Sequence, residues 1–348
     1  MNAEPDAHEE PPDGSRVVAA SDTADPDDGD GAATGDADRD PLVPRAFREY
    51  GEDRLPQAPA FGHGKHGVAE LVVARSGDNP TRLVSDFVKV PYHLTGTLDS
   101  DPAEGLTTIC LQDPTGAVTQ GDRHTLSVEA RPNSRAHVTT QSATKVHSMK
   151  ASYAHLDATL VADAGSYLEY LPGPTILNED ARCLQTTAVS MAADATVVVG
   201  DVFVPDGLSA HEPFGFDHYH GRLEARVDGS LVCADAVDLR PEERDPRDPA
   251  TVGEYGVVGT LYVFAPSEPD VDALADRLHD RVVDDRESAS AAAGTVVAGA
   301  SVLRDGAGVT VRVLGDRSAD VTAAVEAAWD ETREALLGVG APLEGRGR

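Results

Sequence analysis

The chain has 348 residues, 40% of them hydrophobic, which is enough to bury a sizeable core in one large domain or two smaller ones. Its formal net charge is −31, because 60 acidic residues stand against 29 basic ones. No basic stripe is present to neutralise phosphates, so the composition excludes nucleic acid as a partner.

The acidic residues are spread along the whole chain, and only four residues are lysines: Lys65, Lys89, Lys145 and Lys150. A surface of one charge sign repels itself unless salt screens it, and the screening length falls to about 3 Å at 1 M salt. We interpret the composition as that of a protein from a strongly saline cytoplasm. The alternative, that the acidic residues store or attract cations, is weaker because they do not gather at one locus.

Neither a disulfide framework nor a membrane segment is expected. Cys110, Cys183 and Cys233 lie far apart and form no Cys-x-x-Cys pair. No run approaches eighteen apolar residues, and the chain starts with acidic residues rather than with a basic patch and an apolar block. We therefore expect a cytoplasmic protein without a membrane span.

Residues 1–62 are rich in Asp, Gly and Pro and poor in large apolar side chains. Such a segment buries too little surface to offset the entropy lost on ordering. The sequence therefore predicts a disordered acidic tail.

Residues 63–240 read as many short strands separated by turn residues, without the period of a helix. The predicted strands are 68–75, 83–90, 107–111, 125–130, 136–141, 158–162, 167–171, 184–191, 196–203, 222–227 and 231–236. This pattern predicts a mainly β body, either a many-stranded β-sandwich or a β-helix-like stack. The sequence does not separate the two.

Residues 241–348 predict a small C-terminal α+β portion packed on the body, which could also belong to a single domain with it. Strands are expected at 260–264, 295–298 and 309–314, and helices at 271–283 and 319–337. The second helix carries an apolar stripe of Val321, Val325, Trp329 and Leu336. We expect Trp329 to lie in the core.

Motifs of common enzymes are missing, since neither Gly-x-x-x-x-Gly-Lys-Ser/Thr nor Gly-x-Ser-x-Gly occurs. His218 and His220 would share one face of a strand, because side chains two residues apart point the same way. Two histidines alone make a weak metal site, since an ion needs further protein ligands. We therefore expect no retained metal, with His218 and His220 as weak candidates only.

Four charged residues stand beside apolar strands or in the loops between them: Asp122, Lys145, Asp201 and Glu212. Isolated charges are costly to bury unless they are paired or solvated. They could form ion pairs that fix loops, or line a passage whose carboxylates offer oxygen ligands to a hydrated divalent cation. Transit requires weak, repeated contacts, because an ion held too firmly cannot leave. The residues alone leave both interpretations open.

Five segments together resemble the UreD (UreH) family of urease accessory proteins. They occur in the family's order, from about residue 68 to 337, and are Pro114-Thr-Gly-Ala-Val-Thr-Gln-Gly-Asp-Arg123, Val138-Thr-Thr-Gln-Ser-Ala-Thr-Lys-Val146, Leu168-Glu-Tyr-Leu-Pro-Gly-Pro-Thr-Ile176, Gly207-Leu-Ser-Ala-His-Glu-Pro-Phe214 and Gly308-Val-Thr-Val-Arg-Val-Leu-Gly315. Each segment is a weak signal, but the ordered set is specific.

The resemblance implies a mostly β, non-catalytic urease maturation factor. Such proteins bind apo-urease and UreF, and UreF recruits the nickel-carrying GTPase UreG. Nickel in transit, rather than a tightly bound cofactor, would pass through the protein to the urease active site. Carried over by motif, Asp122, Lys145, Asp201 and Glu212 would line or support that passage.

The chain departs from the family pattern at several positions. Leu208 stands where the family has arginine, and His211 replaces the glycine before Glu212. These changes affect the loop that carries the candidate partner contacts Gly207, His211 and Phe214.

Two other classes of function are alternatives to a urease maturation factor. A β-helical carbohydrate-active hydrolase would use two of the carboxylates as acid and base, but it needs sugar-stacking aromatic side chains, and only 5% of the residues are aromatic. A stand-alone metal-binding module would be built on His218 and His220.

Overall fold

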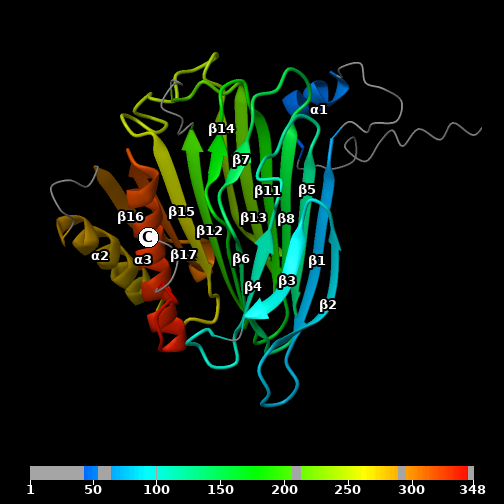
Figure 1. Cartoon of the computed structure of the whole chain (residues 1–348). Coiled ribbons are helices and arrows are strands. Elements are labelled where there is room, and N and C mark those ends of the chain that lie inside the picture. Colours follow the sequence, from blue (N-terminus) through cyan, green and yellow to red (C-terminus); the bar gives the residue numbers. More distant parts are fainter. Residues whose placement is uncertain (1–42, 54–63, 99, 206–212, 289–294, 344–348) are drawn as a thin grey trace, which may run out of the picture. The chain divides into compact units, whose positions relative to one another are not determined.

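The computed structural model describes residues 43–53, 64–98, 100–205, 213–288 and 295–343, and the side chains of 284–288 are not included in that description. The strands form two sheets (Figure 1). The seven-stranded sheet has the order β14 (Ser230–Leu239), β13 (His218–Val227), β11 (Arg182–Met191), β8 (Ala154–Ala162), β5 (Arg123–Ala130), β1 (His66–Ala74) and β2 (Arg82–Lys89).

The second sheet has ten strands. Its main path is β16 (Val296–Val302), β17 (Gly308–Gly315), β15 (Val257–Phe264), β12 (Thr196–Pro205), β9 (Tyr167–Leu171), β6 (Arg135–Thr140), β4 (Thr107–Gln112) and β3 (His93–Leu98). The short strands β10 (Thr175–Leu177) and β7 (Thr144–Val146) pair with each other, and β10 also pairs with β12.

The chain crosses from one sheet to the other at nearly every step between β4 and β13. Within each sheet these successive strands are parallel: β5 pairs with β8, β8 with β11 and β11 with β13, while β4 pairs with β6, β6 with β9 and β9 with β12. Each circuit therefore adds one strand to the main path of each sheet, and β7 and β10 are additional short strands of the second sheet. The mainly β prediction is confirmed, and the body is a two-sheet solenoid, closer to the β-helix-like alternative.

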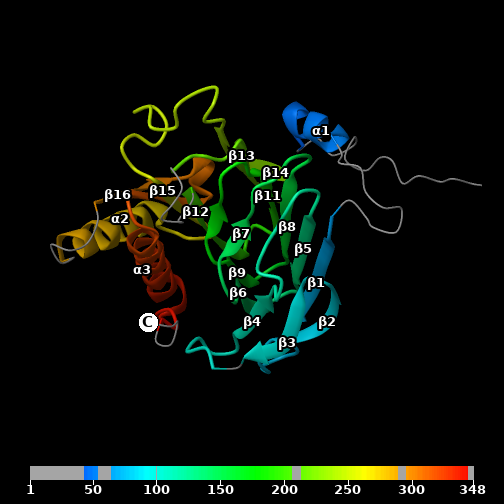
Figure 2. The same cartoon turned by 45° about the horizontal axis from the view of Figure 1, so that its top comes forward.

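The core between the sheets follows from the alternation of side chains along each strand. Leu126, Val128 and Ala130 of β5 face the same interior as Val197 and Val199 of β12. A second apolar cluster lies between the ten-stranded sheet and two helices, α2 (Val271–Ser288) and α3 (Ser318–Leu337). Both C-terminal helices were predicted, and they lie near β15, β16 and β17 (Figures 1 and 2). The ten-stranded sheet thus continues across residue 240.

Helix α3 is fixed to the sheet by a buried ionic cluster as well as by apolar contacts. Trp329 has no exposed surface, which confirms it as core. One turn later, Arg333 contacts Asp101 (2.6 Å) and Glu169 (3.2 Å), and His137 lies 3.0 Å from the same Glu169 carboxylate. Burial alone would raise the pKa of Glu169, but the hydrogen bond and charge of His137 and the charge of Arg333 lower it. The cluster therefore keeps Glu169 ionised without contact with water.

The expectation of a disordered segment over residues 1–62 is wrong for residues 43–53, which include helix α1 (Arg45–Glu52). Phe47 is 0% exposed and packs its ring against Tyr153 and His218, with centroid distances of 5.1 and 4.4 Å. One aromatic anchor therefore orders a helix in a sequence of otherwise low hydrophobicity. Residues 1–42 and 54–62 lie outside the described part.

Within the described ranges, none of the helices has both the length and the apolar content needed to cross a lipid bilayer.

Candidate functional site

The space between the two sheets becomes polar at one end. The inward-facing rows are apolar at 126, 128 and 130 in β5, at 189 and 191 in β11, and at 197 and 199 in β12. They continue to His124 in β5, through Thr187 to Gln185 in β11, and to Asp201 in β12. Because strands of the two sheets run in opposite directions within each circuit, the start of β5 and β11 faces the end of β12. The three polar side chains therefore collect at the same end of the solenoid.

Two adjacent cavities occupy this polar end. The first has a volume of about 70 Å³ and the second about 60 Å³. They share a wall made of Tyr170, Pro172, Gln185 and Thr187. One water molecule needs roughly 10–15 Å³ of such space, so each cavity has room for a few waters.

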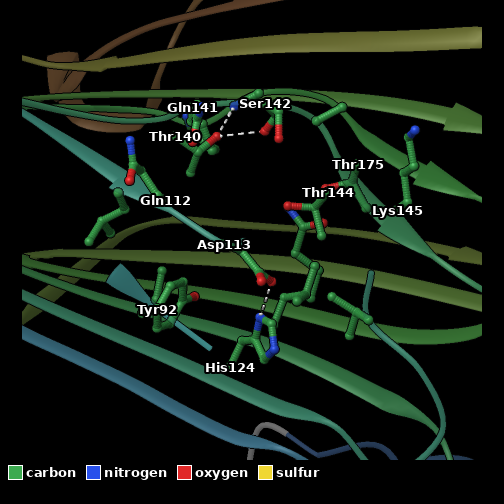
Figure 3. A pocket seen from close by; sticks show the side chains of 18 of the residues that line it. Tyr92, Gln112, Asp113, His124, Thr140, Gln141, Ser142, Thr144, Lys145 and Thr175 are labelled. Atoms are coloured by element: carbon green, nitrogen blue, oxygen red, sulfur yellow. Dashed lines mark hydrogen bonds and ion pairs between the residues drawn. The ribbon is translucent and has the colours of Figure 1, made fainter. Parts of the chain in front are cut away.

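Many of the side chains that line the first cavity carry hydroxyl or amide groups (Figure 3). Thr140, Gln141 and Ser142 lie on one side of the view, and Asp113 and His124 face each other on the opposite side. The Oδ2 atom of Asp113 is 3.9 Å from Nδ1 of His124. The side chains of this cavity present oxygen and nitrogen atoms that could contact an ion, but these atoms do not surround one point on all sides.

The second cavity contains Asp201, the passage candidate that the sequence placed at the end of an apolar run. Gln185 Nε2 donates to Asp201 Oδ1 (2.9 Å), and Tyr219 donates to the carbonyl oxygen of the same Gln185 side chain (3.3 Å). Burial raises the pKa of Asp201, against the opposing influence of the Gln185 hydrogen bond and the Arg312 charge. Asp201 is thus a poorly solvated carboxylate that gains from a nearby cation.

A charged pair lies at the side of this second cavity. Arg312 donates to Asp235, and the Tyr262 hydroxyl donates to the same Asp235 oxygen. Arg312 and Asp235 are partly exposed, so they mark the boundary between the cavity and solvent.

Asp122 fixes a loop rather than lining either cavity. Its carboxylate is 1% exposed and accepts hydrogen bonds from the backbone N–H groups of Lys65 (2.7 Å) and Thr119 (2.8 Å). Lys65 Nζ lies 3.3 Å from the same carboxylate. The preceding Gly121 has φ 78°, and Gly64 lies so close to it that a Cβ would meet the Gly121 carbonyl oxygen at 2.1 Å. Asp122 therefore supports the strand that carries His124.

Lys145 lies on β7 in the lining of the first cavity and is exposed. Its ammonium group points away from Asp113 and His124 (Figure 3). The backbone holds this strand in place, because Val118 N–H donates to the Lys145 carbonyl (2.8 Å). The positive charge consequently lies at the rim of the cavity.

The passage candidate Glu212 and the partner candidates Gly207 and His211 lie outside the described residues. Phe214, the third partner candidate, is 6% exposed and packs in an apolar cluster with Phe203 and Phe216. The prediction that Phe214 contacts a partner therefore does not fit its burial, because its ring is already covered by its own chain.

His218 and His220 lie against helix α1, beside Phe47 and Tyr50. His218 Nε2 donates to Asp238 Oδ1 (2.6 Å), and its Nδ1 lies 3.3 Å from the Tyr50 hydroxyl. His220 Nδ1 is 3.6 Å from the same Asp238 oxygen. In the part of the chain that the structure describes, no group of three or more His, Cys, Asp or Glu side chains is arranged to hold a metal ion.

Sequence reasoning missed His124, Asp113, Gln185 and Arg312. For His124 and Gln185 a signal was present, because each continues a row of inward-facing apolar residues at a spacing of two. Asp113 and Arg312 carry no comparable pattern, and only the pairing of distant strands brings them to the cavities.

These features define a β-solenoid protein with a pair of polar cavities at one end of its interior. The chain matches the family model described as UreD urease accessory protein over residues 65–345. It therefore belongs to the UreD family of urease accessory proteins.

Individual relatives agree with this assignment. The chain is 66% identical over 311 residues to the urease accessory protein UreD of Haloquadratum walsbyi, which covers 89% of this chain and 99% of that protein. It is 65% identical over 304 residues to UreD of Natronomonas pharaonis, covering 87% and 99% of the two chains. A more distant relative, UreD of Photorhabdus laumondii, is 31% identical over 297 residues and covers 84% of this chain and 89% of its own length.

Proposed function

We propose that this chain is a non-catalytic, cytoplasmic urease maturation factor that binds apo-urease and UreF and conducts nickel from UreG toward the urease active site. Membership of the UreD family supports a role in urease maturation. The observation that carries the conduction step is the pair of polar cavities that share Gln185 and Thr187 in a common wall.

The chemistry of the cavities suits an ion in transit. Hydroxyl, amide and carboxylate oxygens can hydrogen-bond to the water shell of a divalent cation. Asp201 adds a negative charge that burial leaves poorly stabilised, and a passing cation would relieve that cost. Because these groups are single and spaced apart, they attract an ion without enclosing it.

Partner binding and nickel delivery are tested separately. In buffer with concentrated KCl, the tagged chain should co-purify with UreF and apo-urease. Deleting its gene should leave urease assembled but poor in nickel, as measured by metal analysis of the purified enzyme. Fully active urease in the deletion strain contradicts the proposal.

Replacing one cavity carboxylate tests the route. Groups around the water shell of a bound metal commonly contribute roughly 10–100-fold, so we expect Asp201→Asn to slow nickel loading of urease by about tenfold or more. The free energy of unfolding should stay equal or rise at pH 7, because burial disfavours the charged form of Asp201 and the neutral amide avoids that cost.

Asp194→Asn is the matched control, since Asp194 is exposed in the turn between β11 and β12. Nickel loading is measured with purified components, and co-purification with UreF is checked for each variant. If Asp201→Asn loads nickel at the wild-type rate, Asp201 has no part in conduction.

A further inference from the structure

The ten-stranded sheet contains a break in its hydrogen-bonded ladders. β12 pairs with β9 as far as Val199 and with β10 from Phe203 onward. In this described part of the sheet, the ladders between β6 and β9 and between β7 and β10 do not include residues 140–143 or 172–174. The break is therefore bordered by three short segments, 140–143, 172–174 and 200–202.

The sequence explains why the ladders stop at these positions. Pro172 and Pro174 have no backbone N–H, so this stretch lacks two of the donors that a ladder needs. The Gly173 N–H donates to the Thr140 hydroxyl (2.8 Å), which in turn donates to the Ser142 carbonyl oxygen (3.0 Å) (Figure 3). A Cβ on Gly173 would lie 2.7 Å from that carbonyl oxygen. A hydroxyl group and a glycine thus hold the two loops together in place of a ladder.

The same segments separate the two cavities from a groove on the outer side of the sheet. This groove has a volume of about 830 Å³ and lies between the sheet and α3, and all three bordering segments line it. Residues 140–143, together with Pro172 and Gly173, also line the first cavity. Gly200 and Asp201 also line the second cavity. Only one layer of chain therefore lies between the groove and each cavity.

The β12 border of the break carries little side-chain cover. Gly200 faces the groove, because Val198 and Val202 on the same face of the strand pack in the cluster beneath α2 and α3. A Cβ on Gly200 would lie 3.2 Å from the Leu171 side chain, so even a methyl group would crowd the break. The next residue, Asp201, points to the opposite side, into the second cavity. A carboxylate that gains from a cation thus lies directly behind a position without a side chain.

An ion that crosses the protein must enter and leave at different places. Arg312 and Asp235 mark one boundary of the second cavity with solvent. They lie on β17 and β14, and β15 and β12 stand between β17 and the break. We propose that the break is a second opening of the passage, through which a hydrated divalent cation moves between the groove beside α3 and the two cavities. This inference rests on the proposed function and gives its route a position in the ten-stranded sheet.

The reaction of a thiol inside the cavities tests whether the break is open. Thr187→Cys places a thiol in the wall that both cavities share, in a Cys110→Ser background because Cys110 lines the groove. Mass spectrometry follows labelling by methyl methanethiosulfonate in concentrated KCl. We expect added Ser142→Trp to slow labelling, because the exposed Ser142 borders the break. Ser85→Trp, an exposed change on β2, is the matched control and should leave the rate unchanged.

Nickel loading of urease by purified components tests whether ions use this opening. The chain with Ser142→Trp should lose most of its effect on loading, while its co-purification with UreF and apo-urease stays unchanged. Gly200→Val narrows the break from the β12 side and is measured alongside it, with labelling and loading expected to change in the same direction. Ser85→Trp should load nickel like the wild type. Thermal unfolding establishes that each variant is folded.

Labelling and loading that stay unchanged in both Ser142→Trp and Gly200→Val overturn the inference, and conduction remains intact if Asp201→Asn still slows loading. Slower loading with lost co-purification and unchanged labelling would assign the groove to a partner contact, which also overturns it. Conversely, the wild-type chain could fail to raise nickel loading while labelling still depends on the break. In that case the opening stands and the proposed function fails.

Discussion

At the scale of single residues, the charged side chains near the cavities have distinct tasks. Asp122 holds a loop through two backbone N–H groups from distant or neighbouring turns, whereas Asp201 has the side-chain amide of Gln185 as its side-chain partner and a cavity beside it. The sequence analysis grouped them because both stand next to apolar strands. Their burial and partners now distinguish a supporting residue from a candidate passage residue.

Replacing Asp122 should therefore affect stability before function. Asp122→Ala leaves the partly buried N–H groups of Lys65 and Thr119 without their acceptor, and because water reaches them in part we take about 1–3 kcal/mol as the cost for the two together. We expect a loss of free energy of unfolding in that range, measured by denaturant titration in concentrated KCl. Asp86→Ala, an exposed change on β2, should stay within about 0.5 kcal/mol. Equal stability of the two variants would show that the loop contact contributes nothing.

At the scale of elements, helix α3 depends on a charge cluster that cannot tolerate the loss of one partner. Arg333→Met would remove the guanidinium that contacts the buried carboxylates of both Asp101 and Glu169, and would leave Glu169 with His137 as its remaining cationic neighbour. Breaking a buried ion pair on one side typically costs about 3–5 kcal/mol, and we expect a destabilisation of this size by thermal or denaturant unfolding. The exposed Arg304→Met provides the control. A loss below about 1 kcal/mol would mean that apolar packing alone holds α3.

Helix α1 depends on histidines that must remain uncharged. Burial lowers the pKa of His218 and His220, against the influence of Asp238, and Arg240 adds to the lowering for both. Above pH 6.5 the imidazoles are neutral whether α1 is docked or released. Below this value the released form takes up protons more readily, so docking should weaken as the pH falls.

Hydrogen exchange of residues 45–52 measures this docking directly. We expect protection at pH 7.5 to exceed protection at pH 5.5, after correction for the intrinsic exchange rate, while β8 and β11 keep theirs. The replacement His220→Gln should reduce the pH dependence. If wild-type protection is the same at both pH values, the imidazoles do not control α1.

The alternation of apolar side chains predicted most of the longer strands, and helical spacing predicted the two C-terminal helices and the buried Trp329, whereas β3, β7 and β10 were not predicted. It could not reveal that successive strands pair in parallel across circuits, because register depends on contacts between residues far apart in sequence. Helix α1 was not predicted for a related reason. It is held by the contact between the rings of Phe47 and Tyr153, which lie far apart in the sequence. Of the candidate site, Asp201 and Lys145 were found in advance, whereas the contribution of Asp113 required the fold.

At the scale of the whole molecule, a net charge of −31 makes stability depend on salt. Repulsion between like charges acts over about 10 Å at 0.1 M salt but only about 3 Å at 1 M. We expect the thermal unfolding midpoint to fall when KCl is reduced from molar concentrations to 0.1 M. The uncharged co-solute sucrose at matched osmolality controls for general solvent effects and should not replace the salt. An unchanged midpoint would contradict the saline interpretation of the composition.

The parallel winding also fixes the distance between successive circuits of the solenoid. Neighbouring strands in a sheet are about 4.8 Å apart, so adding or removing one circuit between β5 and β11 would change the distance between the two end strands by that step. The inward rows would stay aligned, because equivalent positions such as Leu126 and Ala158 are already in register. The length of the solenoid can thus change in whole circuits without redesign of its interior.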